Sequence, residues 1–338
     1  MNKALVVVLL VFVVLLGAWI AQRHSFGIAQ VWDAISADDD TSESLAKLPK
    51  GALPAEVLAV LDYDFLPEAS GVAVSGLNPQ RLWLINDSGG RSELVALDLD
   101  RQTFTRVNLL DTPNVDWEDL ETFNYRGTPW VVVADVGDNK ARRRDVSLYF
   151  LPEPTANERR VRVHSVITLS YPDGPRDVES LAVDSVTNTL YLLSKRERFP
   201  KLYAIALPEL GEEQEYRLAP TLLGEVRSIP APTEEDLKRS PKYGKHRSQP
   251  TGMSHVPDGS GIVLLTYGAS YFAPLDAERS WLRALNDSLC AVSRPELKQA
   301  ESIAADVERR IYITSEGKKA PVLRLTPGPE CLVSVQSG

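Results

Sequence analysis

Two columns of polar residues recur along the chain and are the first candidates for chemistry. Each copy is a polar step into a short apolar run, as in Asp177–Asp184. The first column holds acids and amides: Glu68, Asp116, Asp177, Gln249 and Gln299. The second column, two residues later, holds Ser70, Glu118, Glu179, Thr251 and Glu301. If the copies converge in space, the second column supplies a ring of oxygen atoms of the kind that binds a hard cation.

The spacing of the second column predicts a repeat fold. Its intervals are 48, 61, 72 and 50 residues, and a period near fifty is typical of propellers and solenoids. Each copy is followed by two more β-branched and aromatic runs, with turn residues such as Asn78–Pro79 and Thr187–Asn188 between runs. Three or four short strands per period indicate propeller blades, so we predict an all-β, five-bladed β-propeller over residues 55–338.

Three details of this propeller stay open at the level of sequence. Glu56–Leu61 could close the ring beside the last repeat, and Cys331–Val335 competes for the same place. A sixth, degenerate blade could lie between Leu207 and Ser248. Cys290 and Cys331 fall in consecutive repeats and could pair outside the cytoplasm, but spacing alone does not bring their Cα atoms within bonding distance.

A propeller directs the inner strand of every blade to a central channel, where we predict a metal site formed by Glu118, Glu179 and Glu301. Carboxylates this close cannot all stay ionised unless a cation or basic side chains compensate them. Ca²⁺ is the cofactor that suits such a set of oxygen ligands. The alternative is that these acids cap backbone amides or pair with nearby basic residues.

Polar residues at the strand ends form a second set of candidates, because a propeller usually presents its binding face there. The predicted ligand-binding residues are Asn86, Asp87, Asp116, Asp135, Asp138, Asn139, Arg143, Lys195 and Arg196. The basic members could bind a small anionic ligand through a carboxylate or phosphate. The alternative is that the Asp and Asn side chains satisfy turn backbone groups, while the basic residues form a solvated, charge-balanced loop.

Three short segments of the sequence resemble a known group of proteins. They are Asn86–Gly89, Asp116–Asp119, and Asp135–Asn139 with the arginines that follow it. Together they resemble a largely uncharacterised family of bacterial secreted β-propellers, and more distantly the phytase-like and gluconolactonase-like propellers. The resemblance spans roughly residues 66–326. Phytase-like propellers bind Ca²⁺, so the resemblance also implies a calcium site, but it does not imply a particular reaction.

The N-terminus predicts a membrane anchor. Residues 4–22 carry no charge, and nineteen helical residues reach about 28 Å, close to the thickness of a bilayer's hydrocarbon core. We therefore expect a transmembrane signal anchor at 1–22, a stalk at 23–54, and a propeller in the periplasm of a bacterial inner membrane. The alternative is a protein secreted after signal cleavage. A net charge of −9 argues against nucleic acid as a partner.

Two functions fit this sequence. The first is a membrane-anchored, extracytoplasmic module that binds a small ligand or a protein partner, with Ca²⁺ in its channel. The alternative is a metal-dependent hydrolase of a phosphoester or lactone. No nucleophile elbow or phosphate-binding loop is present. His246 or His255 could act as a base, although a lone histidine near a strand is more often a packing residue, and Trp117 is expected to pack between blades.

Overall fold

The computed structural model describes residues 55–155, 157–294, 297–328 and 331. The predicted anchor at residues 1–22 and the stalk at 23–54 lie outside this part of the chain. Within the described part, no helix is both long enough and apolar enough to cross a bilayer.

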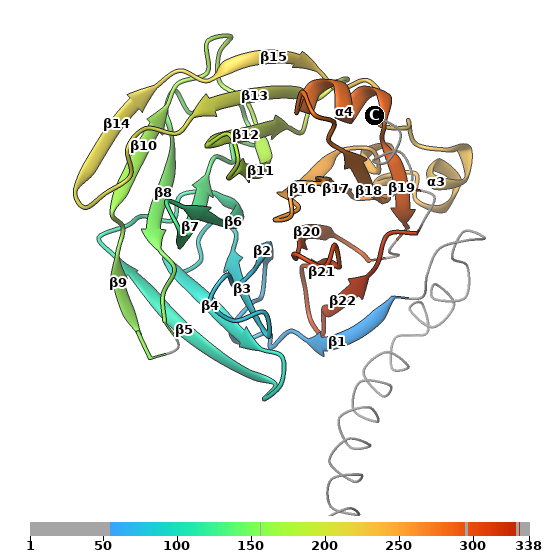
Figure 1. The fold of residues 1–338 in the computed structure, drawn as a ribbon. Coiled ribbons are helices and arrows are strands. Elements are labelled where there is room, and N and C mark those ends of the chain that lie inside the picture. The colour runs from blue at the N-terminus through green and yellow to red at the C-terminus, as the bar shows by residue number, and fades with distance from the viewer. Residues whose placement is uncertain (1–54, 156, 295–296, 329–330, 332–338) are drawn as a thin grey trace, which may run out of the picture. The chain divides into compact units, whose positions relative to one another are not determined.

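Five sheets surround a central channel (Figure 1), which confirms the predicted all-β, five-bladed propeller. Blade I contains β2 (Ala69–Val74), β3 (Arg81–Asn86), β4 (Glu93–Asp98) and β5 (Thr103–Leu110). Blade II contains β6 (Trp117–Tyr125), β7 (Thr128–Asp135), β8 (Val146–Pro152) and β10 (Ser165–Leu169). Blade III contains β11 (Val178–Asp184), β12 (Thr189–Ser194), β13 (Lys201–Ala206) and β15 (Thr221–Glu225). Blade IV contains β16 (Pro250–His255), β17 (Gly261–Thr266), β18 (Ser270–Pro274) and β19 (Cys290–Ser293). Blade V contains β20 (Ala300–Ala305), β21 (Ile311–Ser315), β22 (Pro321–Leu325) and β1 (Glu56–Val60).

The ring is closed by the N-terminal strand. β1 pairs antiparallel with β22, and Glu56 lies opposite Arg324. The N-terminal segment, rather than Cys331–Val335, therefore closes the ring. Cys331 instead forms a disulfide with Cys290 of blade IV, with the two Cα atoms 5.6 Å apart.

The interval from Leu207 to Ser248 forms no sixth blade, so that alternative is wrong. Its first strand, β14 (Gln214–Leu218), pairs parallel with β10 and extends blade II. Its second strand, β15, completes blade III. The short β9 (Arg160–Arg162) extends blade I in the same way, by pairing parallel with β5.

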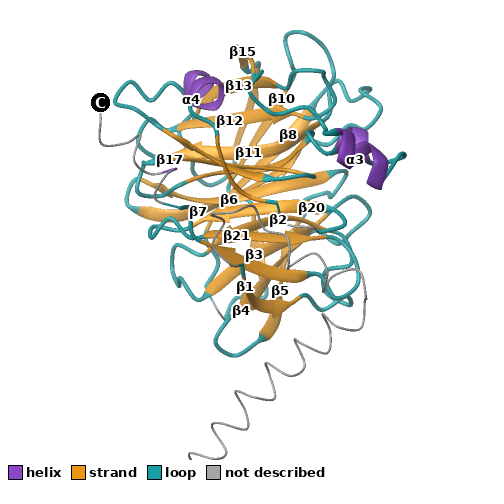
Figure 2. Cartoon of the chain, turned by 90° about the vertical axis from the view of Figure 1, so that its right-hand side faces the viewer, coloured by secondary structure: helices purple, strands orange, loops and turns teal. Residues whose placement is uncertain are grey.

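The remainder of that interval carries α3 (Glu234–Arg239) and the 3₁₀ turn η1 (Gly244–His246). A second helix, α4 (Trp281–Asp287), lies in blade IV between β18 and β19. The two helices lie on opposite faces of the propeller (Figure 2).

Apolar side chains fill the space between each pair of neighbouring blades. The cluster between blades I and II, for example, buries Trp117 completely, with its ring 6.3 Å from that of Tyr149. The prediction that Trp117 packs between blades is therefore confirmed. These contacts fix the inner strands relative to one another, and so fix the lining of the channel.

Every inner strand contains a β-bulge at its second-column residue. The pairing register shifts on either side of Ser70, Glu118, Glu179, Thr251 and Glu301. A bulge leaves one residue out of the ladder and turns its side chain in a new direction. The repeated column in the sequence is therefore a repeated backbone irregularity, located where each inner strand begins.

Candidate metal centre at the mouth of the channel

The inner strands all begin at one end of the channel, here called the mouth. The bulges on β6, β11 and β20 leave Glu118, Glu179 and Glu301 buried there. The two hydroxyl members of the column behave differently. Ser70 Oγ donates to the carbonyl of Trp117 at 3.0 Å, and Thr251 Oγ1 donates to that of Ala300 at 2.7 Å. These two side chains therefore join neighbouring blades and are not placed among the acids.

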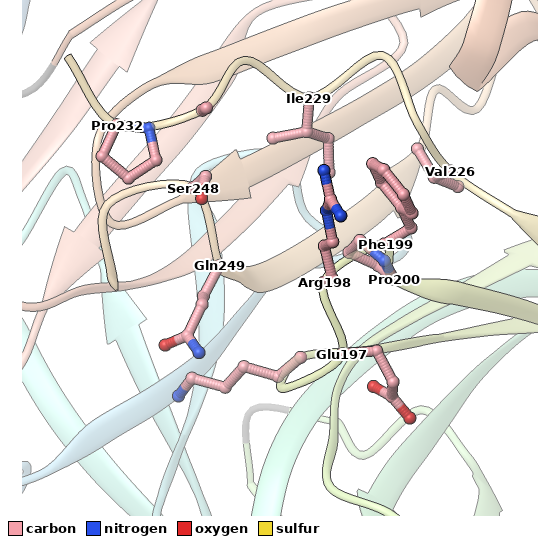
Figure 3. Close-up of a pocket in the computed structure, with 11 residues that line it drawn as sticks. Glu197, Arg198, Phe199, Pro200, Val226, Ile229, Pro232, Ser248 and Gln249 are labelled. Atoms are coloured by element: carbon pink, nitrogen blue, oxygen red, sulfur yellow. The ribbon is translucent and has the colours of Figure 1, made fainter. Parts of the chain in front are cut away.

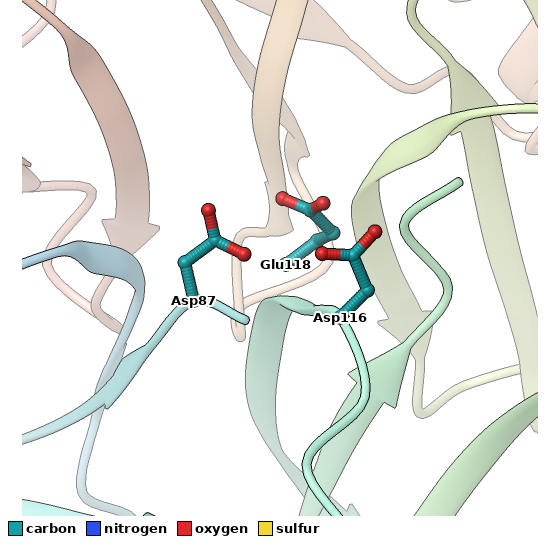
Figure 4. Close-up of side chains that lie close together, drawn as sticks. All are labelled: Asp87, Asp116 and Glu118. Atoms are coloured by element: carbon teal, nitrogen blue, oxygen red, sulfur yellow. The ribbon is translucent and has the colours of Figure 1, made fainter. Parts of the chain in front are cut away.

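Three carboxylates converge on one side of the mouth. Asp87 follows β3, Asp116 precedes β6, and Glu118 is the bulged residue of β6. One oxygen of each lies within 4.8 Å of the others, and Figure 4 shows the three carboxylates turned toward one another. Glu118 also belongs to a second group with the same spacing, together with Asp177 and Glu179.

Basic side chains neutralise two of the three acids of the second group, Asp177 and Glu179. Asp177 is paired with Arg196 and also accepts the backbone N–H of Asp138 at 2.8 Å. Glu179 is paired with Lys195. Asp177 and Glu179 thus already have the basic partners that the alternative interpretation of the sequence expected.

The first group forms no ion pair among the described residues. Asp87 accepts only the backbone N–H of the adjacent Ser88. Asp116 and Glu118 have neither an ion pair nor a side-chain hydrogen bond in the described part of the chain. Glu118 is only 6% exposed, and a buried carboxylate without a donor is costly. Burial raises the pKa of Glu118 and the charge of Lys195 lowers it, but Lys195 pairs with Glu179 and not with Glu118.

A glycine allows the first group to pack this closely. A Cβ built on Gly137 would lie 2.7 Å from Asp116 Oδ2 and closer still to Glu118 Oε1. Real Cβ contacts are not found at such distances, so any other residue would push the carboxylates away. Gly137 therefore forms the wall of a cradle for these two acids.

Glu118, Asp116 and Glu179 at the mouth have pKa values above their ordinary values. Burial, followed by repulsion from Glu179, holds the pKa of Glu118 well above its usual range. Burial and the neighbouring Asp87 raise the pKa of Asp116 to about 6. Burial raises the pKa of Glu179 to about 7, although Lys195 opposes this. A bound cation would favour the ionised form of all these groups.

A hydrogen-bonded chain crosses the other side of the mouth. Lys195 contacts Glu179 and donates to Tyr267 Oη at 2.8 Å, and Tyr267 donates to Glu301 Oε1 at 2.7 Å. Burial alone would lower the pKa of Lys195, but Glu179 and Glu301 raise it above its ordinary value. Burial also raises the pKa of Glu301. Lys195 is therefore a buried ammonium between two acids, linked to one of them through a phenol.

Of the predicted ligand-binding residues, Asn86 lies outside the group of acids. Its amide donates to the carbonyl of Phe65 at 2.9 Å and accepts the N–H of Glu68 at 3.2 Å. It therefore braces the chain that leads into blade I.

The remaining predicted residues hold the loops at the mouth in place. Asp135 accepts the backbone N–H of Asp116 at 3.1 Å and pairs with Arg143 at 2.7 Å. Asp138 accepts the backbone N–H of Arg143 at 2.6 Å. Asn139 accepts from Arg196. Asp135 therefore fixes the backbone at Asp116, and the other side chains hold the loop that follows β7.

A third column at the mouth escapes the sequence pattern. In four blades the residue directly after the second strand, and in blade II the residue one position later, donates its N–H to the carbonyl of the first-column residue. This column consists of Asp87, Gly137, Lys195, Tyr267 and Glu316. Aligning the ends of the second strands would have found Tyr267 and Glu316. Burial and the acids around it raise the pKa of Glu316 to about 7.

Neither histidine candidate contacts the three acids. His255 lies at the far end of β16, where its Nε2 is 3.0 Å from an Arg279 nitrogen and its ring packs on Trp281. Burial lowers the pKa of His255 to about 4. His246 Nδ1 lies 3.0 Å from Gln249 Oε1 in the loop before blade IV.

No protein-family model and no curated protein matches the chain. Several solved propellers are distantly similar to it. A gluconolactonase from Xanthomonas campestris is 14% identical, with 77% of this chain and 72% of that chain covered and a TM-score of 0.40. Regucalcin from Agrobacterium tumefaciens, a calcium-binding protein, is 12% identical, with 80% and 93% covered and a TM-score of 0.45. The soluble aldose sugar dehydrogenase from Escherichia coli is 10% identical, with 83% and 100% covered and a TM-score of 0.41. At these identities the likeness concerns the fold alone.

Proposed function

We propose that the protein is a ligand-binding propeller that holds a Ca²⁺ ion at the mouth of its channel through Asp87, Asp116 and Glu118. The observation that carries this proposal is the buried Glu118 carboxylate, which has no donor in the described part of the chain and faces two further acids. The metal ligands supplied by the three residues are all carboxylate oxygens, which suit Ca²⁺. Zinc would favour His or Cys, and neither occurs among the three.

The surrounding residues fit this role. Gly137 leaves room for the carboxylates to approach one another. Asp135 fixes the backbone before Glu118, and Arg143 compensates the charge of Asp135. Because Lys195 already neutralises Glu179, three unpaired carboxylates remain for the ion.

The direct test is calorimetric titration of Ca²⁺ into the full-length, metal-free protein, with Glu118→Gln and Glu212→Gln as the matched pair. Glu212 is exposed and lies outside the mouth. We expect the wild-type protein and Glu212→Gln to bind one ion equally, and Glu118→Gln to bind at least about tenfold more weakly, since each 1.4 kcal/mol changes affinity tenfold. Equal binding by all three proteins, or no binding by the wild type in millimolar Ca²⁺, would refute the site.

The chain from Lys195 through Tyr267 to Glu301 favours a second candidate, a metal-dependent hydrolase of a phosphoester or lactone. A bound cation would polarise the substrate and lower the pKa of a water molecule. Tyr267 Oη is hydrogen-bonded to the Lys195 ammonium on one side and to Glu301 on the other. It could therefore hold or deliver a proton next to that water molecule.

Tyr267→Phe separates the two candidates. For a hydrolase, we expect the variant to lose roughly a hundredfold in turnover of p-nitrophenyl phosphate or a γ-lactone, while Ca²⁺ affinity stays within about twofold. If the wild type turns over neither substrate in the presence of Ca²⁺, the hydrolase candidate fails and the binding function stands alone.

We also propose that the propeller lies outside the cytoplasm, anchored by its N-terminal apolar run. The disulfide between Cys290 and Cys331 supports this location, because disulfides persist in oxidising compartments. Sodium carbonate extraction of bacterial membranes tests the anchor. Release of the full-length protein into the soluble fraction would contradict it.

A further inference from the structure

A pocket lies beside the mouth, and none of Asp87, Asp116 and Glu118 lines it. Its volume is about 280 Å³, which equals that of roughly nine water molecules. The pocket is lined by Lys195, Glu197, Arg198, Phe199, Pro200, Val226, Ile229, Ala231, Pro232, Ser248 and Gln249. Figure 3 shows Ser248 and Gln249 on one side, with Arg198 and Phe199 on the other. Lys195 belongs to both regions, because it lines the pocket and pairs with Glu179.

An unusually long connection builds one wall of this pocket. At the mouth, the outer strand of each blade is joined to the inner strand of the next. Four of these connections have six or eight residues, whereas residues 226–249, between β15 and β16, number 24. A long connection inside a compact domain is typical of a functional element.

Specific contacts hold this connection in place. The N–H of Val226 donates to the carbonyl of Pro200 at 2.7 Å, and that of Arg227 donates to Asn286 Oδ1 at 2.7 Å. At the other end of the connection, the carbonyl of Gln249 accepts the N–H of Tyr267 at 3.3 Å. The pocket wall is therefore anchored at both ends, which is the state expected of a pre-formed ligand site.

The charges in the pocket point to an anionic ligand. Glu197 pairs with Arg176 at 2.7 Å, and Lys195 pairs with Glu179. Arg198 has no acidic partner in the part of the chain that the structure describes, and its guanidinium lies 5.1 Å from the centre of the Phe199 ring. An exposed guanidinium on an aromatic ring binds planar oxyanions well, because it offers several N–H donors in a fixed geometry.

Apart from Ser248 and Gln249, the rest of the lining is apolar. Phe199, Pro200, Val226, Ile229, Ala231 and Pro232 form this part of the wall. Such a surface favours an apolar ligand body, because contact with it removes both surfaces from water.

We propose that this pocket binds a small molecule with an apolar body and one carboxylate or phosphate group, and that Arg198 pairs with that group. Phe199 and Ile229 contact the body. The shared Lys195 puts the bound molecule next to the proposed cation site, so the pocket supplies the ligand class that the proposed function leaves open. Binding to the pocket itself does not require the cation.

The test uses calorimetric titration of the full-length protein, in EGTA and again in Ca²⁺, with three probes. Benzoate and phenyl phosphate carry the two candidate anions, and benzyl alcohol is the neutral analogue. We expect at least one anion to bind in both buffers and benzyl alcohol to bind at least about tenfold more weakly, because a charge-assisted hydrogen bond is lost. The stronger anion identifies the class of natural ligand.

Two variants and a control locate the binding. Arg198→Ala should weaken anion binding roughly tenfold or more, and Ala231→Trp should abolish it by filling the pocket. Arg142→Ala, which removes another exposed arginine, should change nothing. If neither anion binds the wild type, or if both pocket variants bind as the wild type does, the proposal is overturned. Anion binding in EGTA without Ca²⁺ binding would refute only the cation site, and the reverse result would refute only the pocket.

Discussion

The mouth of the channel and its interior both contain buried acids from β6, but their surroundings are opposite. Glu118, at the mouth, accepts no hydrogen bond in the described part of the chain and faces Asp87 and Asp116. Asp119, the next residue, accepts the backbone N–H groups of Leu120 at 2.9 Å, Leu181 at 2.8 Å and Met253 at 3.3 Å. One carboxylate is surrounded by donors, and the other by acceptors.

Burial does not distinguish these two acids, because it raises the pKa of both. The difference lies in the donors. Asp119 binds N–H groups of blades III and IV and so links them to blade II. Glu118 is the bulged residue directly before Asp119, and the groups that face it are other acids. We infer that an interior acid with donors is structural, and that a mouth acid without donors is available to a ligand.

The largest expected effect is a loss of stability when Asp119, in the interior of the channel, is replaced. Asp119→Ala leaves the N–H groups of Leu181 and Met253 without an acceptor, at about 1–3 kcal/mol each. We expect the free energy of unfolding in urea to fall by about 3 kcal/mol, by the same amount in EGTA and in Ca²⁺. A loss seen only in Ca²⁺ would mean that Asp119 belongs to the cation site, and the comparison would break down.

The next largest effect is expected on Ca²⁺ affinity, when Gly137 in the wall of the cradle is replaced. Gly137→Ala displaces Glu118 and Asp116, so we expect Ca²⁺ affinity to fall about tenfold, or 1.4 kcal/mol. Gly211→Ala is the control, because the nearest atom to its added Cβ, Gln214 Cγ, lies at 3.8 Å. Calorimetry would contradict the cradle if the two glycine variants bound Ca²⁺ equally well.

Glu118→Gln should act on stability with the opposite sign to Asp119→Ala. In EGTA it removes an acid whose ionised form is disfavoured by burial and by the neighbouring acids, and we expect the free energy of unfolding to rise by about 1 kcal/mol. Urea unfolding of the metal-free proteins measures this. A loss of stability in EGTA would show that Glu118 has a structural role like that of Asp119.

The last effect is a pH dependence of the stability of the metal-free protein. The folded pKa of Asp116, about 6, is above its ordinary value, so the folded state binds more protons than the unfolded state between about pH 4 and 6. Stability therefore falls as the pH rises through this window. Asp116→Asn removes the penalty, and its stability advantage over wild type in EGTA should grow from pH 4.5 to 7. A constant difference across that range would show that Asp116 is not perturbed.

The sequence predicted the parts of this site that repeat. The five bulges recur because each blade places the same irregularity at the start of its inner strand, and this leaves a visible column. The third column was missed because its residue types differ from blade to blade, and because Val136 displaces Gly137 by one position in blade II.

Other features depend on contacts that have no local signal. The pairing of Lys195 with Glu179, and of Arg196 with Asp177, depends on where long side chains reach, so sequence could not separate neutralised acids from free ones. Likewise, the interval from Leu207 to Ser248 was considered as a sixth blade, and no local pattern in it indicates that β14 pairs parallel with β10 of blade II.

The most direct test of the central claim is thermal unfolding of the full-length, metal-free protein in EGTA and in millimolar Ca²⁺. An ion that binds only the folded state adds about 2.7 kcal/mol at a hundredfold excess over its dissociation constant, which corresponds to a rise in Tm of roughly 5 °C. We predict this rise for the wild type and its absence for Glu118→Gln. An unchanged Tm in wild-type protein shown beforehand to be free of metal would contradict the calcium site.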